Sequence, residues 1–383
     1  MLNRRKFTAL AASCAVAAPG ILRAQEDMRV VVIGAGAAGL AAVYHLSRAG
    51  VDAQVLEASS RWGGRMMRLS GFSDVPLDLG AEWIHDDPTV LGEIIGEGAD
   101  TLGVDTIEYR PQTYQFWHNG RLRDFDLLRH AYAEVKFLDT TWYGFFERFL
   151  LPEIKDRLRL KVAVSRIDLA GNGVVLHMQD GTEVAADRVV MTVPISMLQR
   201  GQIEIQGGDF DARLAELRKV NFGVGFKLFL KFRERFYPDI LFDGPRSTAL
   251  SDSWSEKTYY DAAFGKPTAQ NILGLFTAWE TDLPRARLDD AALLEDVLRE
   301  LQGIYGDGVR ENFLSAKIQN WTHAPFIEGS YSMTNSSDTY IEDILAPLDG
   351  KLYFAGEALG GDAQSTVNGA AFSAIDAVER LLG

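Results

Sequence analysis

Three glycines and one acidic residue near the start of the chain have the spacing of a dinucleotide-binding site. Gly34, Gly36 and Gly39 form a G-x-G-x-x-G turn directly after the apolar run 28–33. Gly34 permits a tight turn, Gly36 lets the backbone approach a pyrophosphate, and Gly39 lets the next helix pack closely on the strand. Glu57, about twenty residues further on, can accept hydrogen bonds from the ribose hydroxyls.

The elements that must position these residues form a complete β-α-β unit. The run 28–33 predicts a buried strand, the helical pattern 40–49 ends at Gly50, and 52–56 predicts a second strand leading into Glu57. In such a unit the helix N-terminus points its unpaired N–H groups and the positive end of its dipole at the phosphates. The alternative is a glycine-rich turn without a ligand, and the ordered unit around the turn argues against it.

A basic run after the second strand indicates which dinucleotide binds. Residues 60–65 read S-R-W-G-G-R, and this R-x-G-G-R pattern resembles that of the flavin-containing amine oxidases, a superfamily of monoamine oxidases, polyamine oxidases and the lysine-specific histone demethylase. The resemblance implies FAD as the cofactor, with an arginine of the run touching the pyrophosphate; the alternative is a basic surface turn. The cofactor-binding residues implied so far are Gly34, Gly36, Ala38, Gly39, Glu57, Ala58, Arg61, Gly63, Gly64 and Arg65.

Length and charge bound the class of protein. The chain has 383 residues, 47% of them hydrophobic, which suffices for two or three domains with a sizeable core. Its formal net charge is −14; without segment 1–24, which holds four basic residues and no acid, 35 basic residues face 53 acids, or −18. Such an acidic body repels nucleic acid and attracts cations, which fits an amine substrate. No later run reaches the ~18 apolar residues of a membrane span.

Residues 1–24 have the features of an export signal. Residues 3–7, N-R-R-K-F, resemble the twin-arginine motif, 9–18 is mildly apolar, and Ala24 suits a cleavage point. This predicts a periplasmic protein exported already folded, and the alternative is an ordinary basic N-terminus. The chain's one cysteine, Cys14, lies in this segment, so we expect no disulfide, no metal site and non-covalent FAD in the mature protein.

Residues 77–85, L-D-L-G-A-E-W-I-H, resemble the family segment D-L-G-x-x-W-I-H that passes beside the flavin. The resemblance implies that the backbone at Gly80 and Ala81 lies against the flavin, and that Glu82 and His85 point toward the amine. Amino-acid oxidases of the superfamily usually carry an arginine in this segment to hold the substrate carboxylate. Trp83 stands there instead, which favours an amine without an α-carboxylate. The alternative is a loop with ordinary surface polar groups.

The middle of the chain supplies fewer signals. Residues 86–158 indicate mixed helix and loop, shorter than the family's helical substrate section, and the aromatic stretch 132–151 is typical of a core. Strands are predicted at 161–167, 173–178 and 188–193, with a hairpin turn at 180–181 between the last two. T-V-P at 192–194 resembles the point where the family's chain returns to the cofactor domain, and Val164 matches the position that meets the adenine.

Lys227 is the strongest candidate for a catalytic side chain. Alternation along 222–232 places it on the opposite strand face from Phe226 and Leu228. Its position after T-V-P matches the family's flavin-facing lysine, which holds a water near flavin N5 and assists the reaction with oxygen. Desolvation there is expected to favour the neutral amine. The alternative is an exposed lysine on a half-buried strand.

Two further segments resemble the family's substrate wall. Trp321 and the G-S-Y-S run at 329–332 imply a tryptophan near the flavin and Tyr331 as one wall of an aromatic cage for the amine. They follow a strand predicted at 273–279 and a helix predicted at 289–304. Two ordinary core aromatics are the alternative.

The C-terminal part resembles the segment that closes the family's cofactor site. A strand at 351–355 leads into Gly356 and Glu357, and 366–370, T-V-N-G-A, opens a final helix whose N-terminus would stabilise negative charge on the flavin. Thr366 stands at the second cage position, which is aromatic in monoamine oxidases, so the cage would be half open. The remaining cofactor-binding residues implied are Gly80, Ala81, Glu82, Trp83, Val164, Gly356, Glu357, Thr366 and Val367.

These segments predict an α/β fold with a Rossmann-like FAD domain and an α+β substrate domain that has a mixed sheet. The FAD domain is expected from 25–86, 159–217 and 326–383, and the substrate domain from 87–158 and 218–325. The predicted function is FAD-dependent oxidation of a small-molecule amine: hydride passes from its α-carbon to flavin N5, the imine is hydrolysed, and oxygen or a redox protein accepts the electrons. The catalytic residues implied are Lys227, Tyr331, Trp321, Glu82, His85 and Thr366.

Two other functions stay open on the sequence. One is a desaturase or dehydrogenase of the same superfamily that acts on a non-amine and uses another electron acceptor. The other is a flavin-binding protein without catalysis, which the shortened helical section would allow. The sequence makes no prediction of oligomeric state.

Overall fold

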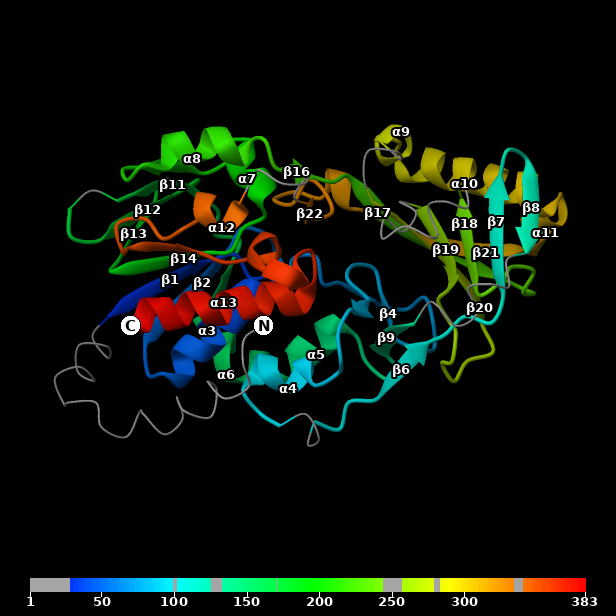
Figure 1. Ribbon diagram of the computed structural model, residues 1–383, viewed down its shortest axis with the longest axis horizontal. Coiled ribbons are helices and arrows are strands. Elements are labelled where there is room, and N and C mark those ends of the chain that lie inside the picture. The colour runs from blue at the N-terminus through cyan, green and yellow to red at the C-terminus, as the bar shows by residue number, and fades with distance from the viewer. Residues whose placement is uncertain are drawn as a thin grey trace.

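The computed structural model describes residues 28–98, 102–124, 133–169, 171–243, 257–278, 283–333 and 340–383, so the predicted signal 1–24 lies outside the described residues. Two sheet-based parts lie side by side along the long axis of the molecule (Figure 1). The part on the left of the view contains both the first and the last strands of the chain, and the part on the right is built on a large sheet.

The first part is built on a five-stranded sheet whose neighbouring strands are all parallel. Its strands come from separated segments of the chain, as predicted for an assembled FAD domain. The central strands are almost entirely buried because helices or a second sheet cover both faces, which explains their unbroken apolar runs. In sheet order the strands are β10 (Leu158–Leu160), β2 (Asp52–Glu57), β1 (Arg29–Ile33), β14 (Arg188–Met191) and β23 (Leu352–Phe354).

Two helices from opposite ends of the chain cover one face of this sheet (Figure 1). They are α3 (Ala37–Arg48) and α13 (Val367–Leu382), and their shared core is rich in alanine, which lets the two helices approach closely. Both helices were predicted, although α3 begins earlier than the expected residue 40. Gly34 has φ +101°, so the turn between β1 and α3 requires a glycine.

A second, four-stranded sheet packs on the face of the parallel sheet opposite α3 and α13. Its order is β13 (Glu183–Ala186), β12 (Val174–Met178), β11 (Val164–Asp168) and β15 (Glu204–Gln206), and three helices complete the layer: α7 (Ile195–Gln199), α8 (Phe210–Leu217) and α12 (Ile341–Ile344). The predicted hairpin at 180–181 exists, but it joins β12 to β13 rather than to 188–191. The strand at 188–191 pairs instead with β1, because it is an apolar strand that needs burial on both faces.

The large sheet on the right of Figure 1 is mixed, as predicted for the substrate domain. Its order is β21 (Phe313–Asn320), β17 (Gly225–Phe232), β20 (Asn271–Ala278), β19 (Lys257–Asp261), β18 (Ile240–Asp243), β7 (Tyr114–His118) and β8 (Arg121–Asp124). The helices beside it are α9 (Leu283–Ala286), α10 (Asp290–Tyr305) and α11 (Gly308–Asn312). The alternation of β17 is confirmed: Phe226 and Leu228 pack against α10, and Lys227 lies on the other face.

Segment 87–158 contains more strand than the expected mixture of helix and loop. Besides β7 and β8 it holds β6 (Thr106–Tyr109) and β9 (Glu134–Phe137), which form a small sheet with β5 (Trp83–Ile84). Its helices are α4 (Val90–Ile95), α5 (Trp142–Phe149) and α6 (Leu151–Ile154), and all three pack into the core of α3 and α13. The segment therefore contributes to both parts of the molecule. Its aromatic residues Trp142, Phe145 and Phe146 are core residues, as predicted.

Short elements complete the fold. They are the pairs β3 (Arg68–Leu69) with β4 (Leu77–Asp78) and β16 (Asn221–Phe222) with β22 (Ser332–Met333), and the 3₁₀ turns η4 (Lys155–Arg157), η6 (Trp321–His323), η7 (Glu357–Leu359) and η8 (Gly361–Ala363). Among the helices of the described ranges, none is long and apolar enough to cross a membrane.

Two glycines of the same turn are expected to behave differently when replaced by alanine. A Cβ at Gly39 would lie 1.8 Å from the carbonyl oxygen of Gly34, whereas a Cβ at Gly36 would meet nothing within 4 Å. Gly39→Ala should therefore lower the free energy of unfolding by about 2 kcal/mol. Gly36→Ala should change it by less than about 1 kcal/mol, yet weaken FAD binding. Urea unfolding of the FAD-free proteins and FAD titration check both, and equal stabilities would contradict the packing argument.

Candidate active site

A cavity of about 960 Å³ extends from the glycine turn of α3 to the sheet that contains β17 and β20. This volume is at the upper end for ligand sites and suits a dinucleotide together with a small substrate. Apart from Gly39, all the site residues predicted from sequence lie on its wall: Gly34, Gly36, Ala38, Glu57, Ala58, Arg61, Gly63, Gly64, Arg65, Gly80, Ala81, Glu82, Trp83, His85, Val164, Lys227, Trp321, Tyr331, Gly356, Glu357, Thr366 and Val367. Gly39 lies behind the wall, as its packing role requires.

Glu57 is held in place by backbone amides at the dinucleotide end of the cavity. Its Oε2 accepts a hydrogen bond from Ala35 N at 2.7 Å, and its Oε1 accepts one from Ser59 N at 2.8 Å. Each carboxylate oxygen keeps a further lone pair, so the side chain can still accept hydrogen bonds from a ribose. Val164 lies on the wall of the same cavity.

The two glycine runs touch each other, which brings bare backbone to the cavity wall. A Cβ on Gly64 would lie 3.2 Å from Gly36 Cα. Arg61 donates to the carbonyl oxygen of Gly64 at 2.7 Å and so fixes the shape of the second run. Backbone N–H groups at a helix N-terminus with no side chains in front of them are the usual way to hold phosphate. The run 60–65 is therefore part of the cavity wall rather than a surface turn.

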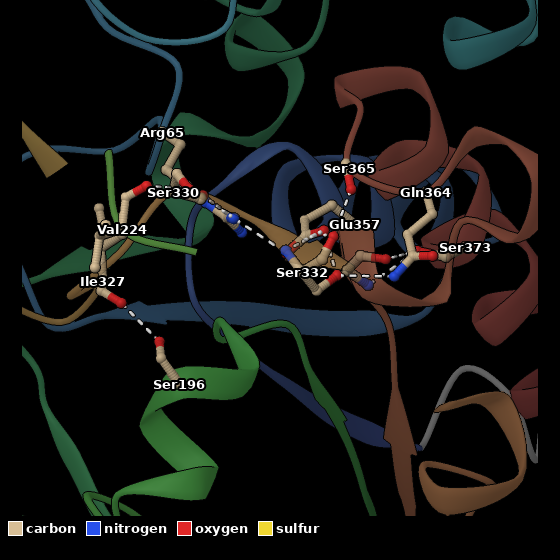
Figure 2. A network of polar contacts seen from close by, with 11 residues as sticks. Arg65, Ser196, Val224, Ile327, Ser330, Ser332, Glu357, Gln364, Ser365 and Ser373 are labelled. Atoms are coloured by element: carbon tan, nitrogen blue, oxygen red, sulfur yellow. Dashed lines mark hydrogen bonds and ion pairs between the residues drawn. The ribbon is translucent and has the colours of Figure 1, made fainter. Parts of the chain in front are cut away.

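A hydrogen-bonded network around Glu357 joins segments that are far apart in sequence (Figure 2). Arg65 Nη1 donates to Ser330 O at 2.7 Å and pairs with Glu357 Oε1 at 3.1 Å. Ser332 Oγ donates to Glu357 Oε2 at 2.8 Å and accepts from Gln364 Nε2 at 3.1 Å. The network fixes the segment after β23 against the segment that carries Tyr331. Sequence reasoning included Ser332 in the G-S-Y-S run but gave it no role, because its partner Glu357 lies 25 residues further along the chain.

Thr366 caps the final helix. Its Oγ1 accepts a hydrogen bond from Gly369 N at 2.9 Å and donates to Ala363 O at 2.7 Å. The N-terminus of α13 therefore faces the cavity, as predicted, and can stabilise negative charge there. Asn368 is 1% exposed, and its Oδ1 has no hydrogen-bond partner within the described ranges.

Lys227 forms a buried ion pair at the opposite end of the cavity. Its Nζ lies 2.5 Å from Glu82 Oε2 and donates to Gly80 O at 3.1 Å, and Tyr260 OH donates to the same Glu82 oxygen at 2.6 Å. The prediction of a neutral amine rested on desolvation alone and did not include this contact between Lys227 and a buried carboxylate. Burial would raise the pKa of Glu82, but Lys227, Lys136 and the two hydrogen bonds hold it below its ordinary value.

Lys136, a second buried lysine that sequence reasoning missed, lies behind Glu82. It is 1% exposed, and its Nζ lies 3.9 Å from Glu82 Oε1. Its Nζ also donates to Ala262 O at 3.3 Å and lies over the rings of Trp83 and Tyr109. Burial lowers the pKa of Lys136 to about 8, although Glu82 acts to raise it.

Two aromatic rings form part of the wall beside Lys227. The ring of Tyr331 is nearly parallel to that of Phe276, with 8° between the planes and 6.5 Å between the centroids. Phe276 is paired with Lys227 across β20 and β17. Sequence reasoning placed Thr366 at the second cage position. It missed Phe276, which supplies a second aromatic ring from another strand. The alternation of β20 could have indicated it, had the pairing with β17 been known.

The remaining predicted residues lie around the same space. Trp321 is 6% exposed and donates from Nε1 to Leu79 O at 3.1 Å. His85 is more exposed, and its Nδ1 lies 3.4 Å from the carboxylate of Glu134, another wall residue. No group of three or more potential metal ligands occurs in the part of the chain that the structure describes.

The residues that line the cavity suit the separate parts of FAD. Glycine backbone and the α3 N-terminus suit a pyrophosphate, Glu57 suits a ribose, and the α13 N-terminus suits the electron-accepting end of a flavin. A Cβ at Gly80 would lie 1.7 Å from Arg65 O and 3.2 Å from the Trp321 ring, so the wall at this point is built on bare backbone. The chain's single cysteine lies outside the described residues, at position 14.

Comparison with known proteins agrees with this geometry. Human lysine-specific histone demethylase 2 is 24% identical over 91% of this chain, and the chain spans only 53% of that protein's length. Polyamine oxidase 5 of Oryza sativa subsp. japonica is also 24% identical, with 91% of this chain and 87% of the oxidase covered. Both matches extend over 91% of this chain.

Solved structures show the same fold. Cyclohexylamine oxidase from Brevibacterium oxydans superposes with a TM-score of 0.75 at 16% identity, covering 93% of this chain and 99% of that one. Putrescine oxidase bound to putrescine gives a TM-score of 0.72 at 16% identity, covering 92% and 98%. The model of the family described as flavin containing amine oxidoreductase matches residues 37–154 and 146–382. This chain therefore belongs to the flavin-containing amine oxidoreductases.

Proposed function

We propose that this protein oxidises a small-molecule amine that lacks an α-carboxylate, with FAD as cofactor and oxygen as the final electron acceptor. One observation carries the proposal: the parallel rings of Tyr331 and Phe276 lie beside Lys227 in the same cavity as the dinucleotide-binding glycines. An aromatic wall, a buried cation and a cofactor site are thus brought together by segments that are distant in sequence.

The residues around this space favour an uncharged amine. Aromatic walls exclude water, and desolvation disfavours an ammonium, so the amine would bind with its nitrogen lone pair available. A substrate carboxylate would need a cationic side chain whose hydrogen-bond donors point at it. Lys227 donates to Glu82 and Gly80, and Arg65 donates to Glu357 and Ser330. Trp83, which stands where amino-acid oxidases carry an arginine, offers no charge.

The reaction balances with water and oxygen as co-reactants. When bound, FAD supplies the acceptor for the hydride that leaves the α-carbon of the amine. Loss of that hydride and of one N–H proton converts the amine into an imine, and water hydrolyses the imine to a carbonyl compound and ammonia or a smaller amine. Oxygen takes up two electrons and two protons to give hydrogen peroxide. We assign no side chain as a strong base.

The first test adds amines to the purified protein without oxygen. Polyamines, aryl-alkylamines, cyclic secondary amines and amino acids are added separately, and the visible flavin band is followed. We expect one amine class to bleach the band and amino acids to leave it unchanged, and admission of air should restore the band with one peroxide per turnover. A flavin that dithionite reduces but no amine bleaches would instead support the non-amine or non-catalytic alternatives.

Lys227→Met should slow the return of the flavin band in oxygenated buffer by about tenfold or more, because it removes the cation beside the developing negative charge. Lys231→Met is the matched control. Lys231 lies on the same strand face, but its Nζ donates to Phe72 O rather than to Glu82. We expect the control to reoxidise at the wild-type rate. An unchanged rate in Lys227→Met would show that oxygen reacts without this lysine.

We also propose that the protein is exported by the twin-arginine route, on the strength of the N-R-R-K-F motif at residues 3–7. In a bacterial host that has this pathway, the natural sequence should appear in the periplasmic fraction with FAD bound. Joint replacement of Arg4 and Arg5 by lysine should leave it in the cytoplasm. Immunoblots of the two fractions distinguish these outcomes, and periplasmic recovery of the double variant would refute the proposed route.

A further inference from the structure

Glu82 is a single buried carboxylate that lies between two buried lysines. Lys227 contacts its Oε2 at 2.5 Å from the cavity side, and Lys136 lies 3.9 Å from its Oε1 on the far side. All three side chains are at most 5% exposed. Lys136 is brought there by strand pairing, because β9 places it directly opposite Trp83 of β5. It does not line the cavity itself.

We propose that Lys136 is a positioning residue of the amine-oxidising site: it shares the Glu82 carboxylate with Lys227, so that one anion faces two cations and the cavity wall carries a net positive charge. The inference rests on the FAD-dependent function proposed above. It assigns a role to a residue that touches neither cofactor nor substrate and acts through Glu82.

The other charged groups near Lys136 do not cancel this charge. Asp261, at the end of β19, is already paired with Arg235 at 2.9 Å. Lys266 adds a further cation and donates to the carbonyl oxygens of Phe137 and Leu138. On β6, the ring of Tyr109 lies under the ammonium.

The groups that face Glu82 do not cancel the excess positive charge either. Burial raises the pKa of Asp78 well above its ordinary value, which favours the uncharged carboxylic acid at this position. Burial also raises the pKa of Tyr260 well above its ordinary value, so its hydroxyl stays neutral and donates a hydrogen bond to Glu82. Glu134, on the same strand as Lys136, lies 3.4 Å from His85, and its side chain is 24% exposed, so solvent screens its charge more than the charges of the buried trio. Among the described residues the trio of Glu82, Lys227 and Lys136 thus keeps one excess positive charge.

A fixed positive charge on this wall acts on whatever occupies the cavity. Charges in a poorly solvated site interact more strongly than charges in water, so the wall favours negative charge on the cofactor and disfavours an ammonium. Without Lys136, Glu82 would neutralise Lys227, and the wall would lose this preference. The second lysine therefore lets Glu82 orient Lys227 without cancelling its charge.

The charge on Lys136 also depends on pH, so the effect of this residue should change as the pH is raised. Because the pKa of Lys136 is lowered to about 8, the residue is a cation at pH 7 and becomes neutral above pH 8. The excess positive charge is then present at neutral pH and lost as the pH rises through that value. A purely structural role in packing β9 against β5 would not change over this interval.

The test measures the midpoint potential of the bound FAD by dye-coupled titration at pH 7 and pH 9.5. At pH 7 we expect Lys136→Met to have a lower potential than the wild type, because a positive charge is removed. The double variant Lys136→Met/Glu82→Gln should return to the wild-type potential, since removing the carboxylate restores one excess positive charge. At pH 9.5 the wild type and Lys136→Met should converge, because Lys136 is neutral there.

The controls separate charge from folding. Lys231→Met removes a lysine from the same strand as Lys227 without touching Glu82, and it should keep the wild-type potential. Lys136→Gln replaces Lys136→Met if the latter does not fold with FAD bound. Equal potentials for wild type and Lys136→Met at pH 7, or no return in the double variant, would overturn the proposal. The measurement needs no amine, so a failure of amine oxidation would appear separately, in the anaerobic bleaching experiment.

Discussion

The structure depends on satisfying the backbone hydrogen-bonding groups of residues 79–83, a segment in which Leu79 and Glu82 are buried and residues 80–83 line the cavity. Buried carbonyl and amide groups must be hydrogen bonded, and here the partners come from distant segments. Trp321 donates to Leu79 O at 3.1 Å, Lys227 to Gly80 O at 3.1 Å, and Trp142 to Trp83 O at 3.0 Å. Ala81 N donates to the carbonyl oxygen of Arg65 at 3.1 Å. The requirement to pair this backbone therefore brings the candidate catalytic side chains to one place.

Several residues consequently have two roles. Trp321 holds the segment and lines the cavity, and Lys227 binds the segment while pairing with Glu82. Thr366 caps α13, and the helix N-terminus it stabilises is also a cavity wall. If variants of these residues lost activity, altered chemistry and altered structure would both contribute to the loss. Variants such as Lys136→Met, whose residue lies outside the cavity, separate the two effects more cleanly.

Local pattern was enough to predict much of the fold and part of the site. The β-α-β unit and the alternation of β17 follow from short-range periodicity and turn chemistry, and the final helix was expected from the family resemblance of residues 366–370. Lys136 and Phe276 were missed because their importance depends on which strands pair: Trp83 opposite Lys136, and Lys227 opposite Phe276. The strand at Glu183–Ala186 was missed for the same reason, since a short polar strand is recognised only through its partner.

The central claim is that the cavity beside Leu79–Trp83 holds the amine and the reacting end of FAD together. A crystal structure of the FAD-bound protein with a bleaching amine, kept anaerobic, tests it most directly. We expect electron density for the flavin ring against the backbone of Gly80 and Ala81, and for the amine beside Tyr331 and Phe276. A flavin ring placed away from Gly80, or an amine bound elsewhere with this space filled by water, would contradict it.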